Sequence, residues 1–122
     1  MISQIHHLGI GVEDIEAQVP VYQGAGFRII NEAKYEGIGR CVMLESGTAR
    51  VELFQFDDPS SELARKINNH TAFATNDLEA DLQYFLGHGY VLAIPIDDGD
   101  YVKRYAYVED PAGNFIELCE LR

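Results

Sequence analysis

The sequence is poor in basic residues and in long apolar segments. Lysine and arginine together number 9 against 20 aspartates and glutamates, which gives a formal net charge of −11. Because such a protein repels a phosphate backbone, we expect no nucleic-acid partner. No apolar run approaches the roughly 20 residues that a membrane-spanning helix needs, and no signal peptide opens the chain. The sequence therefore predicts no membrane partner and a cytoplasmic protein.

Cysteine is scarce as well. Cys41 and Cys119 do not have the spacing of a metal-binding or redox motif. We expect two reduced thiols, buried or half-buried, and the alternative is one disulfide.

One motif occurs twice. The stretch from His7 to Ala17 returns, with substitutions, 63 positions later at residues 70–80. Val51-Glu52-Leu53 returns 65 positions later as residues 116–118. A period of about half the chain indicates two copies of one module. At 122 residues we expect a single domain, with a first module at 1–56, a linker at 57–66 and a second module at 67–122.

Each module is predicted to be βαβββ, which makes the fold class α+β. A strand at 4–12 is followed by a helix that starts at Glu13 or Asp14, contains Pro20 and ends near Gln23. In the second copy, Asn76 is the predicted helix N-cap. The remaining predicted strands lie near 27–34, 40–45, 49–56, 90–95, 102–108 and 114–121, with a short helical piece at 62–67.

Side-chain alternation along the strands places the candidate histidines and glutamates on the strand faces that point away from the expected core. His7 lies on a strand face with two glycines, and Leu8 lies on the opposite, core-facing side together with Ile10 and Val12. His70 likewise shares its face with two alanines, and Glu52 and Glu117 also point away from the expected core. A lone histidine on a strand is usually structural. Four candidates related by one repeat instead indicate a metal site made of His7, Glu52, His70 and Glu117.

This set of side chains predicts a particular chemistry. Two imidazoles and two carboxylates suit one divalent ion such as Ni²⁺, Co²⁺, Zn²⁺ or Mn²⁺. An ion with open positions polarises a bound carbonyl and stabilises an enediolate beside it. Glu52 and Glu117 are the catalytic candidates, because a ligand glutamate that leaves the metal can act as the base that moves a carbon-bound proton.

The segments HHLGIGVEDIEA, NHTAFATNDLEA and YVEDPAGNFIELCE resemble the vicinal oxygen chelate superfamily. This resemblance implies paired βαβββ modules that form a cup-shaped mixed sheet around a metal, a homodimeric assembly and a small-molecule substrate. It also implies that His7, Glu52, His70 and Glu117 are the ligands, a set similar to that of the nickel- or cobalt-preferring glyoxalase I branch. Epimerases of the superfamily usually have Gln at the position of Glu52. Glutathione-dependent glyoxalases commonly have Arg and Asn where this chain has Gly11 and Phe56.

Three functions follow from the resemblance. The first is a glyoxalase I-like lyase of the lactoylglutathione lyase type, which isomerises a thiol hemithioacetal of a 2-oxoaldehyde. The second is an isomerase similar to methylmalonyl-CoA epimerase, and the third is a non-catalytic binding or resistance protein. A dioxygenase fits less well, because its usual metal triad has one carboxylate. Arg40, Arg104 and Tyr105 are expected near the border of the cup, where the arginines are either solvent-facing charges or contacts for a substrate anion.

Overall fold

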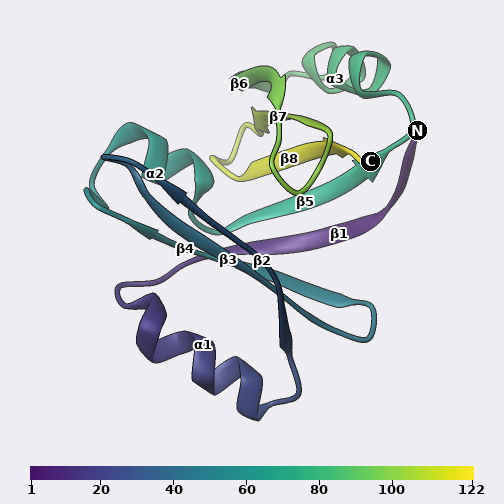
Figure 1. Ribbon diagram of the computed structural model, residues 1–122. Coiled ribbons are helices and arrows are strands. Elements are labelled where there is room, and N and C mark those ends of the chain that lie inside the picture. The colour runs from purple at the N-terminus through teal and green to yellow at the C-terminus, as the bar shows by residue number, and fades with distance from the viewer. The chain divides into compact units, whose positions relative to one another are not determined.

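The computed structural model describes all residues from 1 to 122 and consists of eight strands and three helices (Figure 1). The order strand, helix, strand, strand, strand occurs twice along the chain, with the short helix α2 between the two copies. The α+β class and the two βαβββ modules are therefore confirmed. No helix is both long and apolar enough to cross a membrane. In chain order, the elements are β1 (Ile2–Gly11), α1 (Ile15–Gly24), β2 (Arg28–Tyr35), β3 (Gly39–Ser46), β4 (Ala49–Phe56), α2 (Glu62–Ile67), β5 (His70–Thr75), α3 (Leu78–Leu86), β6 (Val91–Asp98), β7 (Arg104–Glu109) and β8 (Phe115–Glu120).

The chain forms two compact units. One unit consists of His7–Asn69, and the other combines Met1–His6 with His70–Arg122. Each unit contains a mixed sheet, and one helix covers one face of that sheet.

Strand β1 contributes to both units. Its Leu8–Gly11 part pairs in parallel with β4. Near its start, the Ser3 hydroxyl donates to the Ala74 carbonyl at 3.3 Å. The Asn76 amide donates to the Met1 carbonyl at 3.2 Å. The first residues of the chain therefore belong to the unit that the second module builds.

In the unit His7–Asn69, the strands lie in the order β2-β3-β4-β1. The β2–β3 and β3–β4 pairs are antiparallel, and β1 is parallel to β4. Helix α1 continues through Pro20 and ends at Gly24, close to the predicted end. Apolar side chains from the helix and from alternate strand positions form the core on one sheet face: Ile15, Val42, Leu44, Val51 and Leu53.

Leu8 does not follow the predicted inward face of β1. Its side chain is 45% exposed, whereas Ile10 and Val12 pack against the core of this unit. The prediction that Leu8 is a core residue is wrong, because the core cluster of this unit reaches only Ile10 and Val12 on this face of β1.

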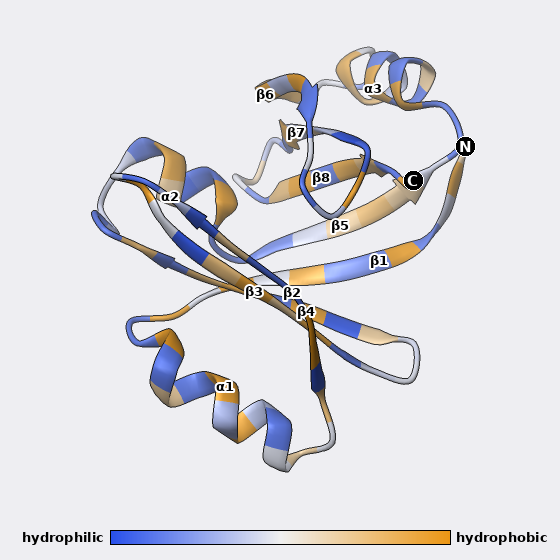
Figure 2. Cartoon of the chain, viewed as in Figure 1, coloured by the Kyte–Doolittle hydropathy of each residue, from blue (hydrophilic) through white to orange (hydrophobic).

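In the other unit, β5, β8, β7 and β6 are neighbours in that order. Strand β5 is parallel to β8, and the other pairs are antiparallel. Hydrophobic and hydrophilic residues alternate along the strands (Figure 2), so that one sheet face packs against α3. Helix α3 contributes one apolar face to the core of this unit: Leu78, Leu82, Phe85 and Leu86.

Both long helices begin at an aspartate. The Asp14 carboxylate accepts from the Glu16 amide at 3.1 Å. The Asp77 carboxylate accepts from the Ala80 amide at 3.1 Å. The prediction of Asn76 as the cap is wrong, because the residue directly before the first helical turn is Asp77, whose extended backbone (φ −150°, ψ 91°) aims its side chain at that amide.

Candidate functional site

His7 and Glu52 form the first of two histidine–glutamate pairs. They lie on the adjacent parallel strands β1 and β4, where Gly9 is opposite Glu52. The His7 Nε2 atom lies 3.4 Å from Glu52 Oε1, and the two side chains are only 2% and 13% exposed. Because Val51 and Leu53 point into the core of the unit, Glu52 between them lies on the opposite sheet face.

His70 and Glu117 form the second pair, on the parallel strands β5 and β8. Ala72 is opposite Glu117 in the sheet register. His70 Nε2 lies 2.9 Å from Glu117 Oε1, and the side chains are 0% and 6% exposed. Leu118 packs into the α3-covered core, which leaves Glu117 on the face that the helix does not cover.

The two pairs share one geometry. In each, the glutamate lies opposite the residue two positions after the histidine, Gly9 in one case and Ala72 in the other. The structure thus brings the predicted ligands together in twos, with one pair in each module.

Tyr107 is a residue of the second pair that the sequence analysis missed. Its hydroxyl donates to Glu117 Oε1 at 3.0 Å and lies 3.3 Å from His70 Nε2. The signal that could have found it is the turn at Asp110–Asn114, whose length fixes the β7–β8 register and sets Tyr107 opposite Glu117.

The donor atoms of these pairs fit a divalent metal ion. A buried carboxylate such as that of Glu117 is costly unless a cation or hydrogen bonds compensate its charge. Each pair presents one imidazole nitrogen beside one carboxylate oxygen. Borderline ions such as Ni²⁺, Co²⁺ and Zn²⁺ prefer this combination of donors.

The two cysteines lie near the same sheet faces as the pairs. Both are free thiols and buried, as the sequence predicts. The Cys119 thiol donates to Glu117 Oε2 at 3.6 Å. Cys41 lies opposite Phe54, two positions beyond Glu52 along β4.

The other two histidines lie outside the two pairs. His88 is exposed just after α3, and its Nδ1 atom lies 2.7 Å from the Tyr84 carbonyl oxygen. His6 is only 4% exposed, with its ring centroid 5.9 Å from that of Tyr101.

Arg40 and Arg104 connect strands to helices. Arg40 forms an ion pair with Glu16 of α1, and Arg104 forms one with Glu79 of α3 at 2.7 Å. Glu120 accepts two further hydrogen bonds from Arg104, which lower the pKa of Glu120. The same bonds raise the pKa of Arg104 above its usual range. Each module therefore has one arginine that forms an ion pair with a glutamate of its helix.

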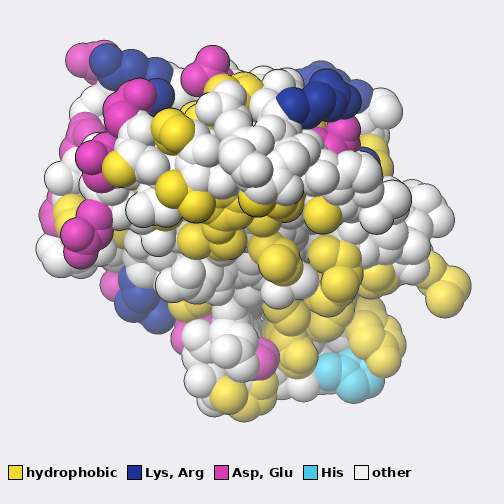
Figure 3. Space-filling view, turned by 90° about the horizontal axis from the view of Figure 1, so that it is seen from below, with side chains coloured by type: hydrophobic (Ala, Val, Ile, Leu, Met, Phe, Trp, Pro, Cys, Tyr) yellow, Lys and Arg dark blue, Asp and Glu magenta, His cyan; other side chains and the backbone are white.

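Most basic side chains at the surface have acidic neighbours. Figure 3 shows one face of the molecule, on which the groups of Lys and Arg side chains lie beside Asp and Glu side chains. Arg28 and Arg50, for example, both form ion pairs with Glu45. The few cations of this acidic chain are thus largely engaged within the protein.

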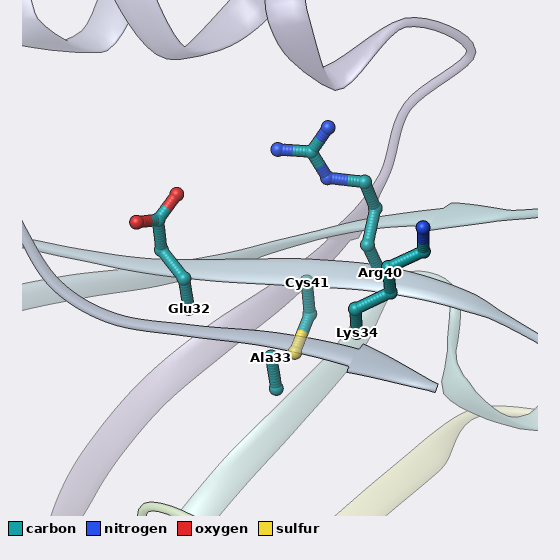
Figure 4. Close-up of a pocket in the computed structure, with 5 residues that line it drawn as sticks. All are labelled: Glu32, Ala33, Lys34, Arg40 and Cys41. Carbon is teal, nitrogen blue, oxygen red and sulfur yellow. The ribbon is translucent and has the colours of Figure 1, made fainter. Parts of the chain in front are cut away.

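A shallow pocket borders the edge of the first module. It is lined by Glu32, Ala33, Lys34, Arg40 and Cys41. Figure 4 shows Glu32, Lys34 and Arg40 extending toward α1, whereas the Cys41 thiol points to the other side of the strands. The cations of this pocket therefore lie on the sheet face opposite to that of the His7–Glu52 pair.

Tyr105 lies beside the second pair. Its ring contacts that of Tyr107 edge-on, with centroids 5.9 Å apart. Burial, followed by the nearby negative charge of Asp97, raises the pKa of Tyr105. The phenol of Tyr105 is therefore harder to ionise than that of a solvated tyrosine.

Asn68 fills the space beside Gly11. A Cβ atom at Gly11 would lie 2.3 Å from the Asn68 Cγ atom, so a larger residue requires Asn68 to move. Phe56 stacks on Phe54 with ring centroids 5.9 Å apart. The two positions at which the resemblance implies glutathione contacts thus carry no polar side chain.

Comparison with solved structures shows the same fold elsewhere. Methylmalonyl-CoA epimerase from Mycobacterium tuberculosis is 22% identical, with a TM-score of 0.82 over 99% of this chain and 89% of that one. A variant of methylmalonyl-CoA epimerase from Streptomyces coelicolor, in complex with 2-nitronate-propionyl-CoA, is 24% identical, with a TM-score of 0.81 over 99% of both chains. A hypothetical protein from Bacillus halodurans C-125 is 21% identical, with a TM-score of 0.80 over 98% of this chain and 94% of that one.

No curated protein sequence matches the chain significantly. The model of one protein family, described as the Glyoxalase/Bleomycin resistance protein/Dioxygenase superfamily, matches residues 4–118. This range includes both histidine–glutamate pairs and nearly the whole chain. The chain therefore belongs to the Glyoxalase/Bleomycin resistance protein/Dioxygenase superfamily.

Proposed function

We propose that the protein is a metal-dependent isomerase that moves a proton at the carbon next to a thioester carbonyl, as an epimerase of a 2-methyl acyl-CoA does. The observation that carries this proposal is the pair of buried histidine–glutamate sites with equal register, His7–Glu52 and His70–Glu117. The likeness to two methylmalonyl-CoA epimerases supports the thioester substrate. The epimerase is therefore proposed ahead of the glyoxalase I-like lyase, which the sequence alone favours.

His7, Glu52, His70 and Glu117 together would coordinate one divalent ion, with nickel or cobalt first and zinc or manganese next. When bound, the ion polarises the thioester carbonyl and stabilises the negative charge that develops on its oxygen. We also propose a homodimer, and the two pairs of one ion come either from one chain or from two.

Glu52 and Glu117 are the proposed acid–base groups, and each would act while its carboxylate is detached from the ion. One carboxylate takes the proton from the carbon next to the carbonyl, and the electron pair of that C–H bond moves into a carbon–carbon double bond, which leaves an enolate. Return of a proton to the other face of that carbon by a carboxylic acid restores the thioester with inverted configuration. Each transfer of this kind typically contributes 10²- to 10⁴-fold to the rate.

The test is hydrogen exchange. Metal-loaded protein is incubated with a 2-methyl acyl-CoA in deuterium oxide, and mass spectrometry measures deuterium at the carbon next to the thioester. We expect uptake of one deuterium with loss of optical purity. Glu117→Gln should slow the uptake by about 100-fold or more.

Glu32→Gln is the matched control, since Glu32 is an exposed carboxylate that points toward α1. It should exchange at the wild-type rate. Metal-loaded wild-type protein without any exchange contradicts the epimerase. Tight binding of the thioester, returned without exchange, supports a non-catalytic binding protein instead.

A glyoxalase I-like lyase is the second candidate. Glu52 favours it, because the resemblance implies a glutamate at this position in the glyoxalase I branch and usually a glutamine in the epimerases. The missing polar contacts at Gly11 and Phe56 count against glutathione as its thiol. Metal-loaded protein with methylglyoxal and each common cellular thiol should form a thioester if this candidate is correct. No thioester with any of these thiols removes it.

A further inference from the structure

Tyr107 makes the two histidine–glutamate pairs chemically different. It lies opposite Glu117 in the β7–β8 register, and Met43 has the equivalent position opposite Glu52 in the β3–β4 register. A phenol hydroxyl donates a hydrogen bond, whereas a thioether offers no donor. The equivalent positions of the two modules therefore differ in whether they offer the glutamate a hydrogen-bond donor.

The surroundings of Tyr107 hold its hydroxyl in place. Its ring lies edge-on to the His70 imidazole, with centroids 5.0 Å apart and planes at 68°. The Tyr105 ring also lies edge-on to the Tyr107 ring, with centroids 5.9 Å apart and planes at 89°. The residue is only 3% exposed, so that water competes little for the hydroxyl.

The Tyr107 hydroxyl donates to the same Glu117 oxygen that lies beside the His70 imidazole nitrogen. Glu117 Oε1 is the atom that lies 2.9 Å from His70 Nε2, and the same atom accepts from Tyr107 at 3.0 Å. Because the hydrogen bond limits rotation of the carboxylate, it fixes one oxygen beside the imidazole nitrogen. A carboxylate oriented in this way loses less freedom when it binds an ion.

We infer that Tyr107 is a positioning residue that fixes the Glu117 carboxylate for a divalent ion. The inference rests on the metal site of the proposed function. Partners that orient metal ligands by hydrogen bonds typically change metal affinity by about 10- to 100-fold.

The test is calorimetric titration of Co²⁺ into chelator-treated protein. Tyr107→Phe removes only the hydroxyl and should weaken Co²⁺ binding by about 10- to 100-fold. The matched control Met43→Leu alters the equivalent buried position without removing a donor, and it should keep wild-type affinity. The visible absorption of bound Co²⁺ should change in Tyr107→Phe and stay as in the wild type in Met43→Leu.

The outcomes separate this inference from the proposed function. Wild-type affinity and an unchanged Co²⁺ spectrum in Tyr107→Phe overturn the role of Tyr107 while the metal site stands. No binding of Co²⁺, Ni²⁺, Zn²⁺ or Mn²⁺ by the wild type overturns both. The thermal unfolding midpoints of the metal-free proteins show whether the variants fold. Tyr107→Met, which copies the first module, tests the same hydroxyl if Tyr107→Phe does not fold.

Discussion

At the scale of single residues, buried polar side chains mark the functional faces. His7, His70 and Glu117 are each at most 5% exposed. Polar groups are rarely buried to this extent unless they are hydrogen-bonded or bind a ligand. Glu52, more exposed than Glu117, lies in the same position of its own module. His6 and Thr75 are as deeply buried, so that only burial combined with the repeated position distinguishes the four proposed ligands.

Asp110 is the residue that anchors the turn before Glu117. Its carboxylate accepts hydrogen bonds from the Asn114 side chain and from the Asn114 and Ala112 amides. These bonds lower the pKa of Asp110, the side-chain bond of Asn114 contributing most. A group with a lowered pKa in the folded state stabilises it above the unfolded pKa, and this stabilisation is lost as the pH falls through the folded pKa.

We therefore predict that Asp110 contributes stability at neutral pH that disappears below about pH 4. Urea unfolding of wild type and Asp110→Asn between pH 7 and pH 3 should show a difference in pH dependence confined to this acidic range. Asn114→Ala, which removes the partner, should reduce the same acid sensitivity. Parallel pH profiles of the wild type and Asp110→Asn would contradict the prediction.

At the scale of elements, sequence periodicity predicts much of the structure. The repeat offsets and strand alternation are sufficient to predict both modules and the faces of His7, Glu52, His70 and Glu117, because a strand has a fixed side-chain period of two. The prediction for Leu8 is wrong for a physical reason, since alternation gives the face of a residue but not how far a core extends along the strand.

Tyr107 shows a second limit of the sequence. Its partner in the sheet follows from the length of the Asp110–Asn114 turn, so its position could be deduced. Its hydrogen bond to Glu117 depends on side-chain torsions that no spacing reveals. The choice between Asn76 and Asp77 as helix cap has a similar origin, because both residue types cap helices and only the backbone angles distinguish the positions.

We predict that α3 depends on Asp77 and not on Asn76. Asp77→Ala removes the acceptor for the Ala80 amide and should lower the free energy of unfolding by about 1 kcal/mol. Asn76→Ala, one position earlier, is the matched control and should change it by less than about 0.5 kcal/mol. Urea unfolding measures both. Equal losses in the two variants would restore Asn76 as a cap.

At the scale of the whole molecule, charge and repeat together favour a bound cation. The formal net charge is −11, and most surface cations already have acidic partners. In each histidine–glutamate pair, a divalent ion would compensate the negative charge of a largely buried carboxylate. Each module supplies only two protein ligands, fewer than the three or four that protein metal sites of this kind use. The proposed function therefore requires both pairs for one ion.

This reasoning predicts one metal ion per chain, and none after the loss of either pair. Elemental analysis of untagged protein should give about one Ni, Co, Zn or Mn per chain, and a variant that lacks both His7 and Glu52 should lose it, as should one that lacks both His70 and Glu117. Two ions per chain, or an ion retained after the loss of one pair, would mean that each pair binds on its own. Mixing the two variants identifies the source of the pairs. Recovery of metal binding shows that two chains of a dimer share a site, whereas continued absence shows that both pairs of a site come from one chain.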